Sequence, residues 1–311
     1  LAEAPMPEAG DGEVLIRTTY LTVDPYMRGR MRDAKSYANP WPLDEAPVGG
    51  AVGIIEKSNH PDFSEGDNVT GSWGWTEHTV SSGAGLTKLD PDEAPVTTAI
   101  GILGMPGMTA YFGFLDICQP KEGEQVFVSG AAGAVGEVVG QIAKIKGCRV
   151  VGSAGTDEKV ERLKSECGYN EAFNYKTDTE FRSVLRGYFP NGIDCYFDNV
   201  GGEMTDAAII NIAPMARISL CGAISQYNNE RAEMGPRIMG QFIGMQTKIE
   251  GFIVTRFQDR FPEGRKQMAQ WMKEGKLKYR EDIVEGIENT PEAFMRMLRG
   301  ENKGKQLVKI S

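Results

Sequence analysis

The first hundred residues alternate short runs of β-branched and aromatic side chains with clusters of Gly, Pro and Asp. Such runs favour strands, and the clusters between them supply the backbone conformations of turns. We therefore predict strands at residues 13–20 and 51–56, and a third strand after a turn at 65–71. Short strands at this spacing indicate a small β-rich barrel or sandwich.

After about residue 100 short apolar stretches alternate with stretches of helical periodicity. This alternation indicates βαβ units and a doubly wound parallel sheet of the Rossmann type, so the fold class is α/β. We predict helices at residues 135–146 and 157–165. The expected strands of this part are 125–128, 148–152, 172–175, 193–198 and 216–221, with one more strand near the end of the chain at 304–310.

The length of 311 residues suggests two domains at roughly 100–200 residues each. With 34 basic and 43 acidic residues the net charge is −9, which does not favour binding to nucleic acid or to an anionic membrane. The sequence contains no run of about 18 apolar residues, so no membrane span is predicted. The chain opens Leu1-Ala2-Glu3, so we expect a truncated start, no signal peptide in what remains, and a cytoplasmic protein.

Cysteine and histidine are few and scattered. The five cysteines are an odd number without a Cys-x-x-Cys pair, which argues against a disulfide framework and for a reducing compartment. The two histidines, His60 and His78, give little material for a zinc site. We expect no metal, a surface position for His60 and a structural hydrogen bond for His78.

A glycine-rich turn follows the strand predicted at 125–128. In the sequence from Ser129 to Gly136, Ala131, Gly133 and Gly136 take the three positions of G-x-G-x-x-G, with Ala134 and Val135 between the last two. Gly133 lets the backbone approach a pyrophosphate, and Gly136 lets the next helix pack tightly. Because the motif lies between a strand and a helix, whose N-terminus attracts phosphate, it predicts a dinucleotide site.

The end of the next strand distinguishes NADPH from NADH. An NAD enzyme usually carries Asp or Glu there, whereas residues 152–156 contain no carboxylate. Ser153 can donate a hydrogen bond to a 2′-phosphate, and Lys159 can supply positive charge. We expect Asp157 and Glu158 to cap the following helix. The sequence therefore favours NADPH.

A series of motifs in one order resembles the zinc-free medium-chain dehydrogenases/reductases, the group of leukotriene B4 12-hydroxydehydrogenase/15-oxoprostaglandin 13-reductase, alkenal double-bond reductase and bacterial curcumin reductase. The resemblance covers nearly the whole chain. The motifs are 22–31 (TVDPYMRGRM), 104–111 (GMPGMTAY), 130–136 (GAAGAVG), 197–202 (FDNVGG), 221–228 (CGAISQYN), 250–254 (EGFIV) and 300–305 (GENKGK).

The resemblance implies a GroES-like substrate and catalytic domain at 1–105 with 280–311, and a Rossmann NADPH-binding domain at 106–279. It implies hydride transfer from NADPH to the β-carbon of an α,β-unsaturated ketone or aldehyde. It also implies a homodimer that joins Rossmann sheets at their edges, with residues 248–254 as the edge strand. Residues 49–53 stand where zinc-dependent relatives carry a Gly-His-Glu ligand segment, and no cysteine precedes Cys118, so a zinc Lewis acid is not expected.

The resemblance also implies the cofactor contacts. At the 2′-phosphate end it places Lys159 and Tyr175, with Ser153 and Gly155 beside them. The remaining contacts that it implies are Asn199, Cys221, Gly222, Ile224 and Tyr227 along the ribose and nicotinamide, Met108 and Thr109 under the nicotinamide, and Asn302 near the diphosphate or ribose.

Reduction without a metal needs a donor at the oxygen where enolate charge develops. We predict that Tyr227 donates to this oxygen or orients a ribose hydroxyl, and a loop aromatic that caps a strand end is the alternative. Tyr26 and Tyr37 are candidates for contact with the substrate, and Tyr26 is also a catalytic candidate. A packing corner at 25–27 is an equal alternative. Phe252 could line the apolar substrate side or lie in a core. Water is a candidate source of the α-carbon proton.

Two other functions fit the same nucleotide motif. One is oxidation or reduction at a carbinol with NADP. The other is a non-catalytic NADPH-binding protein, a sensor or a crystallin-like relative. It would keep Gly133, Ser153 and Lys159 but would need no substrate cleft and no hydroxyl donor at Tyr227. NADPH consumption with a simple enone separates the reductase from the non-catalytic protein, and activity with a secondary alcohol and NADP⁺ separates it from the carbinol enzyme.

Overall fold

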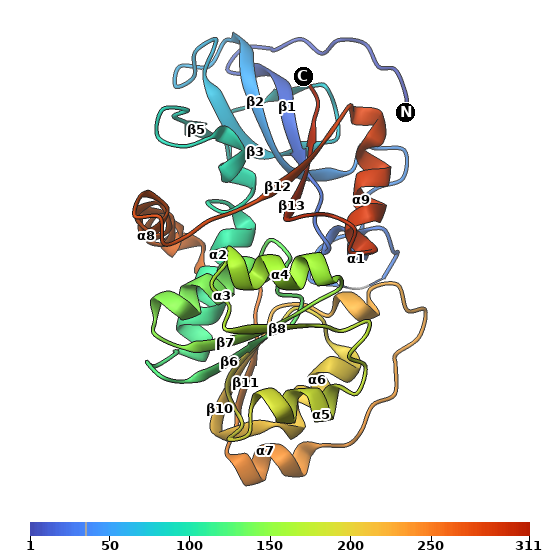
Figure 1. Ribbon diagram of the computed structural model, residues 1–311. Coiled ribbons are helices and arrows are strands. Elements are labelled where there is room, and N and C mark those ends of the chain that lie inside the picture. The colour runs from blue at the N-terminus through green and yellow to red at the C-terminus, as the bar shows by residue number, and fades with distance from the viewer. Residues whose placement is uncertain (35) are drawn as a thin grey trace. The chain divides into compact units, whose positions relative to one another are not determined.

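The computed structural model describes residues 1–34 and 36–311. The chain forms two compact units (Figure 1). The first unit contains Leu1–Gly104 and Glu281–Ser311, and the second unit is the continuous segment Met105–Arg280. The second unit is therefore an insertion into the first. In the described residues, no helix is long and apolar enough to cross a membrane.

The first unit is built on one sheet, flanked by two helices, α1 (Met27–Arg30) and α9 (Thr290–Leu298). Its strands are β1 (Val14–Thr22), β2 (Val48–Ser58), β3 (Asn68–Gly74), β4 (His78–Ser81), β5 (Thr87–Leu89), β12 (Glu281–Glu285) and β13 (Lys305–Lys309). The strand order is β12-β13-β1-β2-β3-β5, with β4 paired to β1. β13 lies antiparallel to β1, with Lys309 opposite Tyr20, so the C-terminal strand completes the N-terminal sheet. This confirms the prediction made for residues 304–310.

A buried lysine ties β13 to the segment that follows β1. Lys305 is 6% exposed, and its Nζ donates to the Thr22 hydroxyl, to Val23 O at 2.9 Å and to Asp24 Oδ1 at 3.0 Å. A buried charge is tolerated when it is paired and hydrogen-bonded in this way. The contact fixes the start of the segment that carries Tyr26.

The second unit is a doubly wound parallel sheet, as predicted. Its strands are β6 (Gln125–Val128), β7 (Arg149–Ala154), β8 (Glu171–Asn174), β9 (Ile193–Asp198), β10 (Ile212–Leu220) and β11 (Lys248–Gly251). Its helices are α2 (Met105–Phe112), α3 (Gly136–Ile145), α4 (Asp157–Ser165), α5 (Phe181–Tyr188), α6 (Gly202–Ile210), α7 (Met239–Met245) and α8 (Phe261–Lys273), with a π-helical segment at Gly113–Cys118.

The strand order β11-β10-β9-β6-β7-β8 places β6 beside both β7 and β9. The chain therefore winds outward from β6 in one direction through β7 and β8, and in the other direction from β9 to β11. Ligands of such sheets bind beyond the carboxyl ends of the strands where the winding reverses, which here is between β6 and β9. β11 is the edge strand, as expected, and it ends at Gly251. The predicted strand at 248–254 therefore extends three residues beyond the observed end.

Aromatic rings fill the core beside this sheet. Phe127 of β6 stacks on Tyr196 of β9 with ring centroids 5.1 Å apart, and on Phe173 of β8 with centroids 6.1 Å apart. All three side chains are 2% exposed or less. Packing of this density makes the sheet a rigid platform for the loops at its carboxyl ends.

Candidate functional site

The glycine turn joins β6 to α3 at the reversal point of the sheet. Gly130 has φ +59°, and the Ala131 N–H donates to Ser153 O at 2.8 Å, which holds the turn against β7. A Cβ on Gly136 would lie 2.5 Å from Gly130 O, so only glycine fits at the start of α3. A Cβ on Gly133 would meet only Gly130 O, at 3.4 Å, an ordinary contact.

The contrast between these two glycines fits a bound pyrophosphate. Gly136 is required by the packing of the protein itself, whereas Gly133 is partly exposed, as are Ala134 and Val135, and leaves room on the ligand side. The N-terminus of α3 points its N–H groups and positive dipole end toward this space. The turn can therefore hold the phosphates of a dinucleotide.

Tyr169 supports the turn from behind and was missed by the sequence reasoning. Its hydroxyl donates to Gly136 O at 2.7 Å, and its ring lies so close to Gly140 that a Cβ there would be 2.0 Å away. The same ring packs on Gly152 of β7, where an added Cβ would lie 2.7 Å from the nearest ring atom of Tyr169. Gly140 was the available signal, because an interior helix glycine costs stability and usually marks a close contact.

A buried ion pair connects the first turn of α3 to α4. Arg162 donates to both carboxylate oxygens of Glu137, with Nη1 at 3.3 Å from Oε1. Burial raises the pKa of Glu137 to about 7, although the Arg162 charge opposes this shift. The pair fixes α4, and with it the side of the site where the adenosine end would lie.

The adenosine side consists of the loop after β7 and the start of α4. The Thr156 hydroxyl accepts the Lys159 N–H at 3.3 Å and is the helix cap. Asp157 and Glu158 lie in the first turn of α4, where acidic side chains are expected to favour the helix end, and the Asp157 carboxylate also accepts a hydrogen bond from Asn174 at 2.8 Å. The Tyr175 hydroxyl lies 2.8 Å from the position of a Cβ on Gly155.

These groups fit a 2′-phosphate better than a bare ribose. β7 ends at Ala154 and runs into Gly155 and Thr156 without a carboxylate, and Lys159 lies in the first turn of α4. Burial raises the pKa of Tyr175, so its hydroxyl stays a donor at neutral pH. Lys159, Tyr175 and Gly155 therefore remain proposed contacts.

The Ser153 side chain is hydrogen-bonded within the protein. It is 0% exposed, and its hydroxyl accepts the Gly130 N–H at 3.3 Å. The buried hydroxyl of Ser153 therefore supports the glycine turn from β7, and its contact with a 2′-phosphate stays a prediction.

The loops after β9 and β10 lie on the other side of the reversal point. Asn199 donates from its side chain to Ser129 O at 2.8 Å, and its own carbonyl accepts the Ile224 N–H at 3.3 Å. The Tyr227 hydroxyl accepts the Ala223 N–H at 3.3 Å and lies 3.1 Å from the position of a Cβ on Gly222. The structure thus brings together the residues expected along the ribose and nicotinamide.

Tyr227 and Cys221 are both protonated at neutral pH. Burial raises the pKa of Tyr227, while the hydrogen bond from the Ala223 amide opposes this shift. Burial, with a smaller contribution from Asp198, raises the pKa of Cys221 to about 12. Tyr227 can therefore donate a hydrogen bond, whereas Cys221 is a poor nucleophile.

Three expected contacts of the second unit are engaged in packing. Met108 is 0% exposed, with its Sδ at 2.9 Å from the position of a Cβ on Gly264, and the Thr109 hydroxyl donates to Met105 O at 2.7 Å. A contact of Met108 or Thr109 with nicotinamide stays a prediction from the resemblance. The Phe252 ring packs against Phe197 and lies 2.3 Å from the position of a Cβ on Gly113, and a contact of Phe252 with substrate stays a prediction.

On the first unit, Tyr26 precedes α1. Its burial, with the Asp24 charge beside it, raises its pKa. Tyr37 is 64% exposed. The Asn302 side chain donates to Gly304 O at 2.6 Å and so holds the turn into β13, while a cofactor contact by Asn302 stays a prediction.

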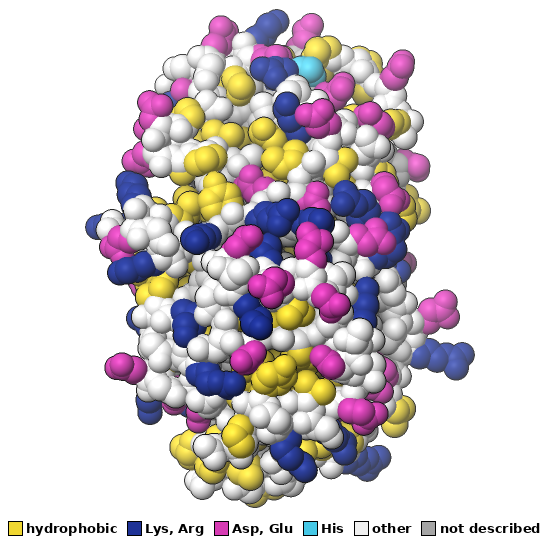
Figure 2. Space-filling model, in the orientation of Figure 1, with side chains coloured by type: hydrophobic (Ala, Val, Ile, Leu, Met, Phe, Trp, Pro, Cys, Tyr) yellow, Lys and Arg dark blue, Asp and Glu magenta, His cyan; other side chains and the backbone are white. Residues whose placement is uncertain are grey.

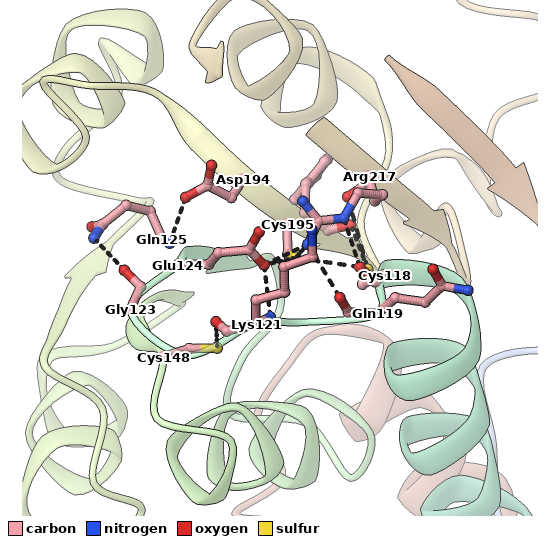
Figure 3. A network of polar contacts seen from close by, with 11 residues as sticks. Cys118, Gln119, Lys121, Gly123, Glu124, Gln125, Cys148, Asp194, Cys195 and Arg217 are labelled. Carbon is pink, nitrogen blue, oxygen red and sulfur yellow. Dashed lines mark hydrogen bonds and ion pairs between the residues drawn. The ribbon is translucent and has the colours of Figure 1, made fainter. Parts of the chain in front are cut away.

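The amino-terminal side of the sheet holds a second polar network (Figure 3). Arg217 pairs with Glu124 and donates from Nε to Cys118 O at 2.8 Å. Its Nη2 lies 3.2 Å from Cys195 Sγ, and both the hydrogen bond with Cys118 and burial raise the pKa of Cys195. These thiols are therefore structural.

The histidines also have structural contacts. His78 Nε2 lies 3.3 Å from Glu56 Oε2, an ion-pair distance, and the expected hydrogen bond of His78 stays a prediction. His60 accepts the Asp62 N–H at 3.1 Å. Among the described residues, no group of three or more His, Cys, Asp or Glu side chains could hold a metal ion.

Comparisons with known proteins agree on one family. A model described as the N-terminal domain of oxidoreductases matches residues 1–89, and one described as zinc-binding dehydrogenase matches residues 134–273. Prostaglandin reductase 1 of Mus musculus is 47% identical over 98% of this chain and 91% of its own length. The chain belongs to the zinc-free medium-chain dehydrogenase/reductase family.

Two further members of this family carry informative names. The NADP(+)-dependent 2-alkenal reductase of Nicotiana tabacum is 44% identical over 98% of this chain and 89% of its own length. CurA of Vibrio vulnificus, solved in complex with NADPH, is 44% identical with a TM-score of 0.95, over 100% of this chain and 93% of that one. The medium-chain reductase fold described above is therefore shared along the whole chain.

Proposed function

We propose that this medium-chain reductase uses NADPH to reduce the conjugated C=C bond of α,β-unsaturated ketones and aldehydes. The observation that carries the proposal is the arrangement at the reversal point of the sheet. A phosphate-binding turn lies beside a strand end without a carboxylate, and a protonated Tyr227 lies on the neighbouring loops. The family relatives that are 2-alkenal and prostaglandin reductases support this reaction.

The residues divide the work. The bound nicotinamide supplies a hydride to the β-carbon. The glycine turn binds the pyrophosphate, and Gly155, Lys159 and Tyr175 bind the 2′-phosphate. Tyr227 donates a hydrogen bond to the ribose hydroxyl or to the substrate oxygen, where negative charge develops as the double bond is reduced. Water supplies the proton of the α-carbon.

On the first unit, we keep Tyr26 and Tyr37 as proposed substrate contacts. Burial beside Asp24 keeps the Tyr26 hydroxyl protonated, so it can donate but cannot act as a base at neutral pH. Tyr37 is exposed and can offer a ring face to an apolar substrate.

The first experiment is the loss of absorbance of reduced nicotinamide with 3-nonen-2-one as substrate, with NADPH and NADH compared and the product identified. A saturated ketone formed with NADPH preferred supports the proposal. Tight binding of NADPH without turnover of several enones would contradict it, and activity with a secondary alcohol and NADP⁺ would assign carbinol chemistry instead.

We also propose a cytoplasmic homodimer joined at β11. On the edge strand Ile249 is 36% exposed, and Ile253, two residues after the end of β11, is 42% exposed. On α7 Met239 and Ile243 are 70% and 79% exposed. Figure 2 shows hydrophobic side chains in the region of α7, as well as at other places on that face. An uncovered strand edge with apolar side chains favours pairing with a second copy. A monomer by light scattering would contradict the dimer.

A further inference from the structure

Asp198, at the carboxyl end of β9, is a buried carboxylate for which the proposed reaction gives no role. It is 1% exposed. Its Oδ1 accepts hydrogen bonds from the Ser129 hydroxyl at 2.9 Å, from Val200 N at 2.9 Å and from Gly201 N at 3.0 Å, and its Oδ2 accepts the Thr205 hydroxyl. Burial of a carboxylate is costly, and four donors offset that cost.

These bonds fix the turn between β9 and α6. The chain reverses at Gly201 and Gly202, which have φ of +74° and +60°, conformations that few residues other than glycine adopt. The Asp198 carboxylate holds the two N–H groups that lead into this reversal and also holds Thr205 in the first turns of α6. The Asp198 side chain thus holds the loop after β9, together with Ser129, which accepts hydrogen bonds from Asn199.

The loop after β10 is built on the loop after β9. The backbone carbonyl of Asp198 accepts Cys221 N at 2.9 Å and Gly222 N at 3.0 Å. The carbonyl of Val200 accepts both the N–H of Ser225 at 3.1 Å and its hydroxyl at 2.6 Å. A displacement of the first loop therefore displaces the second.

The second loop carries Tyr227. Its hydroxyl accepts the Ala223 N–H, and it lies beside Gly222, whose Cβ position is 3.3 Å from Asn199 O. A continuous series of contacts thus runs from the Asp198 carboxylate through two loops to the phenol. We propose that Asp198 is a positioning residue that sets the place of the Tyr227 hydroxyl at the nicotinamide half of the site, an inference that rests on the proposed function.

The residues of the adenosine half follow strands other than β9 and β10. Gly155, Thr156 and Lys159 follow β7, and Tyr175 follows β8, on the opposite side of the reversal point. Loss of the Asp198 carboxylate should therefore disturb the catalytic step and leave recognition of the 2′-phosphate intact.

The test is Asp198→Asn, which keeps the side-chain shape but loses the charge and one acceptor. A misplacement of about 1 Å can lower a rate by about 100-fold. We therefore expect kcat for enone reduction to decrease by about 10- to 100-fold. By calorimetry, the Kd of adenosine 2′,5′-bisphosphate should change by less than about 2-fold, since the phosphate contacts are retained.

The matched control is Asp194→Asn, at the amino-terminal end of the same strand, where the carboxylate accepts the Gln125 N–H at 2.8 Å (Figure 3). This variant should keep wild-type kcat. If Asp198→Asn also keeps wild-type kcat, the proposal is wrong.

A double-mutant cycle separates positioning from a general structural effect. If Asp198 acts through Tyr227, Asp198→Asn should lower kcat by less than about 3-fold in a Tyr227→Phe background, because the hydroxyl that it positions is already absent. An equal decrease in both backgrounds would overturn the proposal. Where Asp198→Asn does not fold, Thr205→Val, which removes one donor and keeps the carboxylate, replaces it in the same cycle with the same criterion.

A failure of the proposed function gives a different result. If the wild-type protein binds NADP⁺ but reduces no enone, the proposed reaction is contradicted. The role of Asp198 is then tested by ligand binding alone. In that case Asp198→Asn must weaken NADP⁺ while leaving adenosine 2′,5′-bisphosphate unchanged, and equal effects on the two ligands would overturn the positioning role.

Discussion

Lys159 is the residue with the strongest expected effect on cofactor choice. It lies in the first turn of α4, next to the Thr156 cap and beyond a strand end without a carboxylate. We expect Lys159→Ala to raise the KM for NADPH by about 10-fold and to leave the KM for NADH nearly unchanged, because a charge-assisted bond to a phosphate contributes about 1.5–3 kcal/mol. Lys164→Ala, on the exposed side of the same helix, is the control. Equal changes for both cofactors would contradict the assignment.

Glu137 gives a prediction about pH and stability. Burial raises its pKa from 4.5 to about 7, so the folded state binds this proton more tightly than the unfolded chain does. The resulting stabilisation is complete below about pH 4.5 and is lost as the pH rises through about 7. The free energy of unfolding of the wild-type protein, relative to Glu137→Gln, should therefore decrease between about pH 5 and about pH 8 in denaturant titrations. A constant difference over this range would show that Glu137 does not titrate in this way.

At the scale of elements, the close contact between α3 and Tyr169 sets the position of the glycine turn. A Cβ on Gly140 would lie 2.0 Å from the Tyr169 ring, so Gly140→Ala should cost about 1–3 kcal/mol and weaken binding of NADPH. Gly187 in α5 has no atom within 4 Å of its Cβ position, and Gly187→Ala should stabilise by up to about 1 kcal/mol. Denaturant unfolding compares the two variants, and similar values for both would refute the steric account.

Elements with a strong local pattern could be predicted from the sequence with accurate bounds. The strands at 125–128 and 193–198 and the helix at 157–165 have the bounds that were expected, because each is a short apolar or periodic stretch between clear turn residues. The strand β12 lacks such a pattern. It contains three acidic residues and exists because it pairs with β13, a contact that local sequence does not encode.

Site residues could be predicted where a sequence motif encodes backbone geometry. They could not be predicted where burial decides whether a side chain can reach a ligand. Gly136 follows from the spacing of the motif, and its observed close packing agrees with that prediction. Serine and phenylalanine occur both in ligand sites and in protein cores. Only the packed structure shows that Ser153 and Phe252 are buried. The role of Asp198 depends on Ser129, 69 positions earlier in the chain, so no local pattern could show it.

At the scale of the whole molecule, Lys305 connects the last strand to the segment that carries Tyr26. Removal of one partner of a buried pair costs about 3–5 kcal/mol, so Lys305→Met should destabilise the first unit by about this amount. Lys309→Met, which affects a 42% exposed lysine, should cost less than about 1 kcal/mol. Binding of adenosine 2′,5′-bisphosphate to the second unit should be unchanged in both variants, and its loss in Lys305→Met would show that the two units do not unfold separately.

The insertion of one unit into the other has a consequence for synthesis on the ribosome. Lys305 follows Thr22 by 283 positions, and at roughly 5–20 residues per second a ribosome needs about a quarter of a minute to one minute to cover that distance. During this time β1 is exposed without its neighbour β13, while the whole of Met105–Arg280 can already emerge and fold. The edge of the nascent N-terminal sheet at β1 therefore stays unpaired until β13 is made. Chaperones that bind unpaired strand edges have this whole interval to act on the N-terminal sheet.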